Sequence, residues 1–107
     1  PRQIEQLEAF IEQHIARPLG VRDLATALER SPSQIARLCR EHLHLTPGHW
    51  IARIKIATSC DLLRTTRLSI SDVARRIGYD DQFHFSRVFK RQMGLSPLKY
   101  RQQQPLL

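Results

Sequence analysis

The sequence contains an internal repeat with a period of about 50 residues. Two segments carry apolar residues at the i, i+3, i+4 and i+7 spacing of a helix with one apolar face; these are Val21, Leu24, Ala25 and Leu28, and then Ile70, Val73, Ala74 and Ile77. A further helical pattern follows each segment and recurs at a shift of 50 residues; it consists of Ile35, Leu38, Cys39 and Leu43, and then Phe85, Val88, Phe89 and Met93. One unit of two short helices joined by a turn therefore occurs twice, which predicts a pair of helix-turn-helix motifs.

The start of the following helix is repeated in the same register. Thr46-Pro47 in the first unit matches Ser96-Pro97 in the second. Thr and Ser are favoured at the N-cap of a helix, and Pro at its first position. Because the caps recur together with the apolar pattern, the repeat indicates helix-turn-helix units more strongly than one such pattern would.

We expect an all-α fold of seven helices that form two helix-turn-helix subdomains joined by a long linker helix. The apolar spacing places the helices at about 2–16, 21–28, 32–43, 47–65, 70–77, 81–92 and 97–102, and Pro18 is expected to end the first. Residues 1–107 then form one domain, with a first lobe at 1–46, the linker at 47–65 and a second lobe at 66–107. Such a linker spans about 28 Å, which approaches the roughly 34 Å between successive major grooves on one side of DNA. The same stretch could also be the central helix of a bundle.

The chain is basic, and the excess of positive charge lies in its second half. The formal net charge is +7; residues 1–50 contain six Lys/Arg and six Asp/Glu, whereas residues 51–107 contain eleven and four. A basic lobe favours a polyanionic partner, with nucleic acid ahead of a membrane surface. No stretch approaches membrane-spanning length, so we expect no membrane association.

The predicted outward face of the second helix in each unit is also repeated. Its positions match at the shift of 50 residues: Ser33, Gln34, Arg37 and Arg40 against Phe83, His84, Arg87 and Lys90. In a helix-turn-helix motif the second helix enters the major groove, where an Arg can bind guanine through two hydrogen bonds. An exposed aromatic ring beside it can contact a thymine methyl group. We therefore interpret this face as a DNA-reading surface.

Two of these residues also have a purely structural interpretation. Phe83 could fold back onto Tyr79 and join the core, and Arg37 could form a surface salt bridge with Glu41. The repeat favours base reading by Arg37 and Arg87, because it places both in one structural position.

Other classes of function find less support in the residues. His42, His44 and His49 lie near Cys39, but their spacing matches no familiar zinc site. No Gly-rich phosphate loop and no Ser/His/Asp arrangement is evident, so we expect no enzyme, no catalytic residues and no cofactor. Cys39 and Cys60 lie in apolar helical patterns and are interpreted as small buried hydrophobic residues. A helical module that binds a partner protein through its basic face is the alternative to DNA binding.

The two units resemble the AraC/XylS family of bacterial transcription regulators. The segment SISDVARRIGYDDQFHFSRVFKRQMGLSPLKYR (69–101) is similar to the family's second helix-turn-helix motif, and PLGVRDLATALERSPSQIARLCREHLHLTPGHWIARIKIATSCDLLRTT (18–66) resembles its first motif and linker helix. The resemblance implies a seven-helix DNA-binding domain whose two motifs enter adjacent major grooves. Three departures from the family pattern lie in the first lobe. His44 stands where the family commonly has Gly, Cys39 replaces an aromatic residue, and Ala36 offers no hydrogen bond at a position that reads bases in some relatives.

Carried over to the matching positions, the resemblance also implies which side chains contact DNA. The base-reading candidates are Ser33, Gln34 and Arg37 in the first unit and Gln82, Phe83, His84 and Arg87 in the second. Arg40 and Lys90 are the candidates for contacts with the DNA backbone. Because the two sets differ, the expected partner is double-stranded DNA with an asymmetric, two-part site.

The resemblance further implies the setting in which such a domain acts. It predicts sequence-specific DNA binding and transcription regulation in the bacterial cytoplasm, with RNA polymerase as a further partner. The chain begins at Pro1 without a Met. We therefore expect it to be a fragment of a longer protein, and the resemblance implies the C-terminal part of an effector-responsive regulator whose effector domain lies outside this chain. A stand-alone, one-domain regulator is the alternative.

Overall fold

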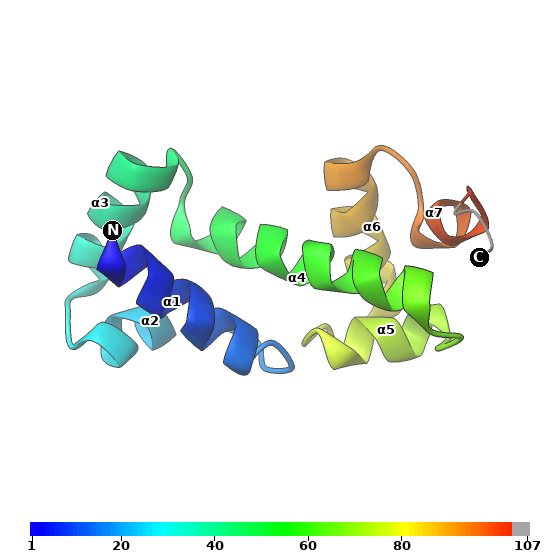
Figure 1. Cartoon of the computed structure of the whole chain (residues 1–107), viewed down its shortest axis with the longest axis horizontal. Helices are drawn as coiled ribbons and strands as arrows, with labels where there is room; N and C mark the ends of the chain where they lie inside the picture. Colours follow the sequence, from blue (N-terminus) through cyan, green and yellow to red (C-terminus); the bar gives the residue numbers. More distant parts are fainter. Residues whose placement is uncertain (104–107) are drawn as a thin grey trace. The chain divides into compact units, whose positions relative to one another are not determined.

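The computed structural model describes residues 1–103, and these form seven helices (Figure 1). The helices are α1 (Arg2–Gln13), α2 (Val21–Leu28), α3 (Pro32–Leu43), α4 (Pro47–Thr65), α5 (Ile70–Arg76), α6 (Gln82–Met93) and α7 (Pro97–Gln103). The predicted all-α class and the predicted number and order of helices are confirmed for this part of the chain. Residues 104–107, the end of the predicted second lobe 66–107, lie outside the described residues.

The first helix ends earlier than its sequence predicts. We expected α1 to continue to about residue 16, but it ends at Gln13, and His14 caps it with a φ of −113°. Arg17 precedes Pro18, and the residue before a proline is disfavoured in helical conformation. The chain therefore leaves the helix through a turn over residues 14–16 before it reaches the proline.

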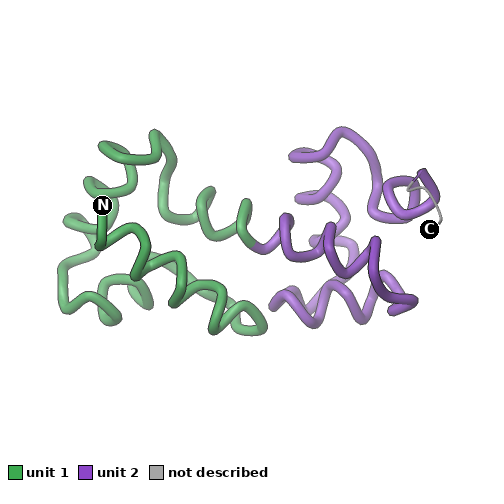
Figure 2. Tube along the Cα trace, in the orientation of Figure 1, with its two compact units in different colours: residues 1–54 green, residues 55–107 purple. Residues whose placement is uncertain are grey.

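The chain divides into two compact units, residues 1–54 and residues 55–107, and the boundary falls within α4 (Figure 2). Each unit has its own apolar core. The first core contains Leu7, Ile11, Leu24, Ala25, Ile35, Cys39, Trp50 and Ile51. The buried apolar residues of the second unit include Ile56, Cys60, Leu63, Val73, Ala74, Ile77, Phe85 and Phe89. Cys39 and Cys60 are both buried and unbonded to each other, as their apolar patterns predict.

The first helix-turn-helix consists of α2 and α3, which pack against each other and against α1. The turn begins at Glu29, whose φ of 54° is left-handed, and the Arg30 amide closes it by donating to the carbonyl oxygen of Ala25 at 2.9 Å. Ser31 then caps α3 by accepting from the Gln34 amide at 3.1 Å. A non-glycine residue in left-handed conformation carries local strain, which the turn's hydrogen bonds offset.

The second helix-turn-helix consists of α5 and α6, which are joined by residues 77–81, and its sequence has one residue more than the first between the matched apolar positions. The helical pattern repeats at a shift of 49 residues before the turn and at 50 after it, because Asp80 is the additional residue. Gly78 takes the left-handed conformation with a φ of 89°, and the Tyr79 amide donates to the carbonyl oxygen of Ala74 at 2.9 Å. Asp81 caps α6 by accepting from the Phe83 amide at 2.8 Å.

Helices α4 and α7, which follow the two helix-turn-helix motifs, begin where the Thr46-Pro47 and Ser96-Pro97 pairs predict. The hydroxyl of Thr46 accepts from the His49 amide at 3.2 Å, and that of Ser96 accepts from the Lys99 amide at 3.1 Å. Pro47 and Pro97 are the first residues of α4 and α7. Both caps are therefore confirmed.

His44 closes α3 in the same way as Gly94 closes α6. Both are left-handed C-cap residues, with φ values of 57° and 84°. The substitution of the usual glycine therefore leaves the turn type unchanged, and the first unit carries the strain of a side chain in this conformation, roughly 1–2 kcal/mol.

Arg101 of α7 binds three backbone carbonyl groups at the end of α4 and in the loop after it. Its Nε donates to Leu63 O at 3.0 Å, its Nη1 to Leu68 O at 2.7 Å and its Nη2 to Thr66 O at 3.4 Å. The last carbonyl groups of a helix have no partner within the helix. One guanidinium thus completes the end of α4 and orders the chain that leads into α5.

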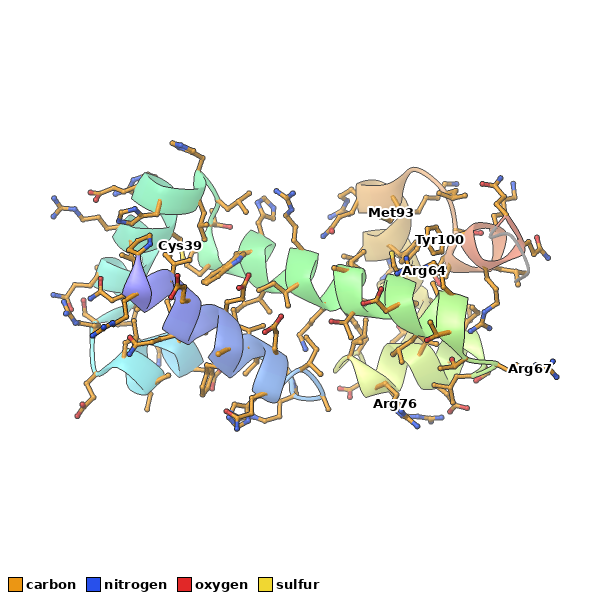
Figure 3. The ribbon with its side chains drawn as sticks, in the orientation of Figure 1. Cys39, Arg64, Arg67, Arg76, Met93 and Tyr100 are labelled. Atoms are coloured by element: carbon orange, nitrogen blue, oxygen red, sulfur yellow. The ribbon has the colours of Figure 1, made fainter. Side chains whose placement is uncertain are left out.

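Arg64 and Tyr100 form a second contact between α4 and α7, and they lie next to each other in Figure 3. Arg64 Nη1 donates to the Tyr100 hydroxyl at 2.6 Å, and Arg64 Nη2 forms an ion pair with Asp61. The Tyr100 ring packs edge-on against Phe89 at 5.5 Å between centroids. This ring contact packs the buried face of α6 against α7.

None of the described helices is long and apolar enough to span a membrane.

Candidate nucleic-acid interface

The second helix of each unit, α3 and α6, exposes the face that the repeat predicts. Its buried positions match, with Ile35 and Cys39 on α3 and Phe85 and Phe89 on α6. The exposed positions match as well; they are Ser33, Gln34, Arg37 and Arg40 on α3, and Phe83, His84, Arg87 and Lys90 on α6. Gln82, the first residue of α6, is half-buried. The sequence-predicted residues thus gather on one exposed face in each unit.

Phe83 is 66% exposed, the largest exposure among the bulky apolar side chains of the described residues. Its backbone amide is held by the Asp81 cap, but its ring lies outside the core. The alternative in which Phe83 joins the core is therefore wrong. A single exposed aromatic side chain is common on protein surfaces and needs no partner. Phe83 is a candidate for contact with a partner because it lies on the repeated, exposed face of α6.

His84 is the aromatic neighbour of Tyr79 instead. The two rings meet edge to face with centroids 5.2 Å apart, and Tyr79 also contacts Phe85 at 5.8 Å. Tyr79 follows the turn glycine, so the second turn itself orients the His84 ring. Burial raises the pKa of the Tyr79 hydroxyl.

Gln34 has a structural task that its exposure alone does not suggest. Its side-chain Oε1 accepts from the backbone amide of Ser31 at 2.9 Å, and its backbone amide donates to Ser31 Oγ at 3.1 Å. This is a capping box, and the sequence Ser-x-x-Gln carries its signature. The side-chain oxygen of Gln34 is thus used by the cap of α3, and its side-chain Nε2 is the group that can donate to an outside partner.

Arg37 and Arg87 occupy matching positions but have different surroundings. Arg37 Nε donates to Glu41 Oε1 at 2.8 Å, so the salt bridge considered from the sequence is present. Among the described residues, no carboxylate forms an ion pair with Arg87, and the residue one turn further along α6 is Arg91. Arg40 and Lys90 lie in the last turns of α3 and α6.

Cys39 and the three nearby histidines do not form a metal site in the structure. Cys39 is buried, whereas His42, His44 and His49 are exposed. Across residues 1–103, no group of three or more His, Cys, Asp or Glu residues is arranged to hold a metal ion. Burial raises the pKa of the Cys39 thiol, which disfavours its thiolate. Cys39 can be found at the left of Figure 3, on the inner side of α3.

The chain matches a family model described as a helix-turn-helix domain over residues 24–103. The regulatory protein SoxS of Escherichia coli (strain K12) is 37% identical over 98 residues, which cover 92% of this chain and 92% of SoxS. The HTH-type transcriptional activator RhaS of Enterobacter sp. (strain 638) is 33% identical over 99 residues, which cover 92% of this chain and 36% of RhaS. The chain therefore spans about a third of the length of RhaS and nearly all of SoxS.

A solved structure with the same arrangement of helices includes DNA. The DNA-binding domain of AdpA, described as a global transcriptional factor and solved in complex with a target DNA, matches with a TM-score of 0.86 and 26% sequence identity. The match covers 92% of this chain and 88% of the AdpA chain. Both helix-turn-helix units of this chain are included in that coverage.

Proposed function

Because this chain belongs to the AraC family of helix-turn-helix DNA-binding proteins, we propose that it binds double-stranded DNA in a sequence-specific manner and regulates transcription. The observation that carries the proposal is the matched, exposed face of α3 and α6, each beginning at a capped helix start and each with an Arg at the same position. In a helix-turn-helix protein the start of this helix meets the base edges.

The proposed roles follow from side-chain chemistry at each position. Arg37 and Arg87 read guanine through paired hydrogen bonds, and Phe83 contacts a thymine methyl group. Ser33, Gln34, Gln82 and His84 offer the remaining hydrogen-bonding groups on the same faces. Arg40 and Lys90, in the last turns of the two helices, bind phosphate groups and set the register on the duplex.

The two units read different sequences under this proposal. Ser33 stands where α6 has Phe83, and the matching Gln34 and His84 are engaged differently, one in a capping box and one against Tyr79. The site is therefore an asymmetric pair of sub-sites rather than a palindrome. We propose that the two helices occupy successive major grooves, so that the centres of the sub-sites lie about one helical turn apart.

The wider setting is part of the same proposal. The domain acts in the bacterial cytoplasm, contacts RNA polymerase after binding its site, and carries out no enzymatic reaction. Relatives of both lengths exist, since this chain spans nearly all of SoxS but about a third of RhaS. An effector-responsive domain joined to this one is the arrangement we propose, by analogy with the longer relatives.

Selection from a random duplex library at moderate salt tests the proposal. The bound fraction should be enriched in two unlike sub-sites whose centres are about one helical turn apart. Enrichment of a single sub-site would mean that one unit only anchors the domain. If the bound fraction kept the composition of the library and binding depended only on salt, the proposal would be wrong and a partner-protein module would replace it.

A further inference from the structure

The most informative difference between the two proposed reading faces is the residue that follows each Arg by one helical turn. In α3 this residue is Glu41, and in α6 the matching residue is Arg91. On this face α6 therefore presents three positive charges, Arg87, Lys90 and Arg91. The matching residues of α3 are Arg37, Arg40 and Glu41, two positive charges and one negative. The repeat therefore preserves the Arg but reverses the charge of its neighbour.

The contact between Arg37 and Glu41 has a specific geometry. Glu41 Oε1 accepts from Nε of Arg37 at 2.8 Å, and both side chains remain largely exposed, at 74% for Arg37 and 53% for Glu41. The hydrogen bond and the charge of Arg37 lower the pKa of Glu41, so the carboxylate stays ionised near neutral pH. The ion pair is thus present on the face that would meet DNA and is not buried away from it.

The atoms used by this contact decide what Arg37 has left to offer. A guanidinium has five N–H donors in a rigid fork, and Nε carries only one of them. With Nε bound to Glu41, the two terminal nitrogens of Arg37 make no hydrogen bond to another described residue and remain available to an outside partner. Two terminal N–H groups are what a bidentate contact with guanine O6 and N7 requires.

The carboxylate has a second effect that opposes binding in general. A negative charge near the phosphate groups of DNA weakens binding to every duplex, and an Arg tied to a carboxylate is less available as a phosphate contact. Sequence preference and general affinity are therefore expected to change in opposite directions when Glu41 is removed.

We propose that Glu41 is a positioning residue of the first unit, which orients the Arg37 guanidinium for base reading and restrains it from binding phosphate. The proposal rests on the proposed function, since it assigns a role within the same DNA-reading face. It predicts that the first unit discriminates between bases but contributes less to total affinity than the second unit.

Two substitutions separate the hydrogen bond from the charge. Glu41→Ala removes both, and Glu41→Gln removes the charge but keeps an oxygen that can accept from Arg37 Nε. Glu12→Gln is the matched control, because it removes one exposed carboxylate from α1 of the same unit. Each variant is selected against the random duplex library and its affinity for a single nonspecific duplex is measured across a range of salt concentrations.

Glu41→Ala should reduce the preference at one base position of the first sub-site by at least about fivefold. It should also raise affinity for the nonspecific duplex severalfold and steepen the salt dependence by about one unit of slope. Glu41→Gln should raise the nonspecific affinity in the same way but retain most of the preference. Glu12→Gln should change neither, and Glu41→Ala in an Arg37→Ala background should have no further effect on preference.

The outcomes distinguish this inference from the function on which it rests. If the unsubstituted domain selects two sub-sites and Glu41→Ala selects the same bases equally well, Glu41 has no positioning role and the proposed function stands. If Glu41→Ala and Glu41→Gln both raise affinity without any loss of preference, Glu41 acts only by repulsion and the inference is overturned. If the unsubstituted domain selects no sequence at all, both the proposed function and the inference fail.

Discussion

The ammonium group of Lys55 donates a hydrogen bond of 2.6 Å to the backbone carbonyl oxygen of Ile77. Lys55 lies in α4 and is only 5% exposed, while Ile77 is the residue that ends α5 immediately before the turn into α6. The carbonyl groups at a helix end need partners from outside the helix. A buried lysine of α4 thus supports the turn that leads to the proposed reading helix of the second unit.

The stability of the domain should therefore depend on pH through Lys55. Burial lowers the pKa of Lys55 from 10.5 to about 8. The unfolded chain then binds this proton more tightly than the folded chain, so the free energy of unfolding should rise with pH between about 8 and about 10.5. The gain over this window is up to about 3 kcal/mol. Above the folded pKa the neutral amine still donates to Ile77, so the hydrogen bond is retained.

Chemical denaturation of the domain and of Lys55→Met across this pH range measures the effect. The unfolding free energy of the unsubstituted domain, minus that of Lys55→Met, should increase with pH. The Met variant has no proton to lose at this position, so only the unsubstituted domain gains stability. Lys99→Met, at an exposed position of α7, serves as the control and should follow the unsubstituted protein. Parallel pH profiles for the domain and Lys55→Met would contradict the assignment.

Arg101→Ala should lower the free energy of unfolding by about 1–3 kcal/mol, because three carbonyl groups lose a charged donor. Arg101→Lys should recover only part of this loss, since an ammonium group cannot span the same three acceptors. Thermal unfolding followed by circular dichroism gives the comparison, with Lys99→Ala on the same helix as the control. A loss no larger than that of the control would mean that these hydrogen bonds do not stabilise the second unit.

His44 and Gly94, the matching left-handed C-cap residues of α3 and α6, should respond to substitution with opposite signs. His44→Gly removes a side chain from a φ of 57° and should stabilise the first unit by about 0.5–1 kcal/mol. Gly94→Ala adds a side chain at a φ of 84°, where it meets no atom within 4 Å, and should destabilise the second unit by about 1 kcal/mol through backbone strain. Equilibrium denaturation measures both. Equal effects of the same sign would show that the conformation of these residues is not the cause.

Phe83→Ala should leave stability within about 0.5 kcal/mol of the unsubstituted domain, because the ring is 66% exposed. The same truncation at Phe85, which is fully buried two residues later, should cost about 3–5 kcal/mol. Affinity for the selected duplex should fall in the Phe83 variant although its fold is intact. A Phe83→Ala domain that binds the selected duplex with unchanged affinity would remove Phe83 from the proposed interface.

Arg87→Ala should weaken binding to the selected duplex by about 1–3 kcal/mol and relax the preference at one base position. Lys90→Ala, one turn along the same helix, is the matched comparison, because a phosphate contact weakens all duplexes alike and flattens the salt slope by about one unit. Competition binding with single-base variants of the selected duplex separates the two patterns. If Arg87→Ala bound every single-base variant in the same order as the unsubstituted domain, its base-reading role would be wrong.

Local signals account for the parts of the fold that the sequence predicted well. The apolar positions of α2, α3, α5 and α6 recur every three or four residues, and the predicted caps at Thr46 and Ser96 each accept from the backbone amide three residues later. The end of α1 was predicted poorly, because the effect of Pro18 extends back to the turn before it. The exposed face of α3 and α6 could be predicted for the same reason as the helices, since it is the complement of the apolar face.

The helices of residues 1–103, their order, the caps at Thr46 and Ser96 and the two matched faces could be predicted from sequence, because each depends on residues within a turn or two of one another. Which distant groups meet depends instead on tertiary packing. Lys55 and Ile77 are 22 residues apart, and Arg101 binds carbonyl groups up to 38 residues away. The structure also settled two alternatives that the sequence left open, since Phe83 stays in solvent and the i,i+4 salt bridge between Arg37 and Glu41 is formed. Such partners depend on how helices pack and which rotamers the neighbours leave open, and no periodicity along the chain encodes that.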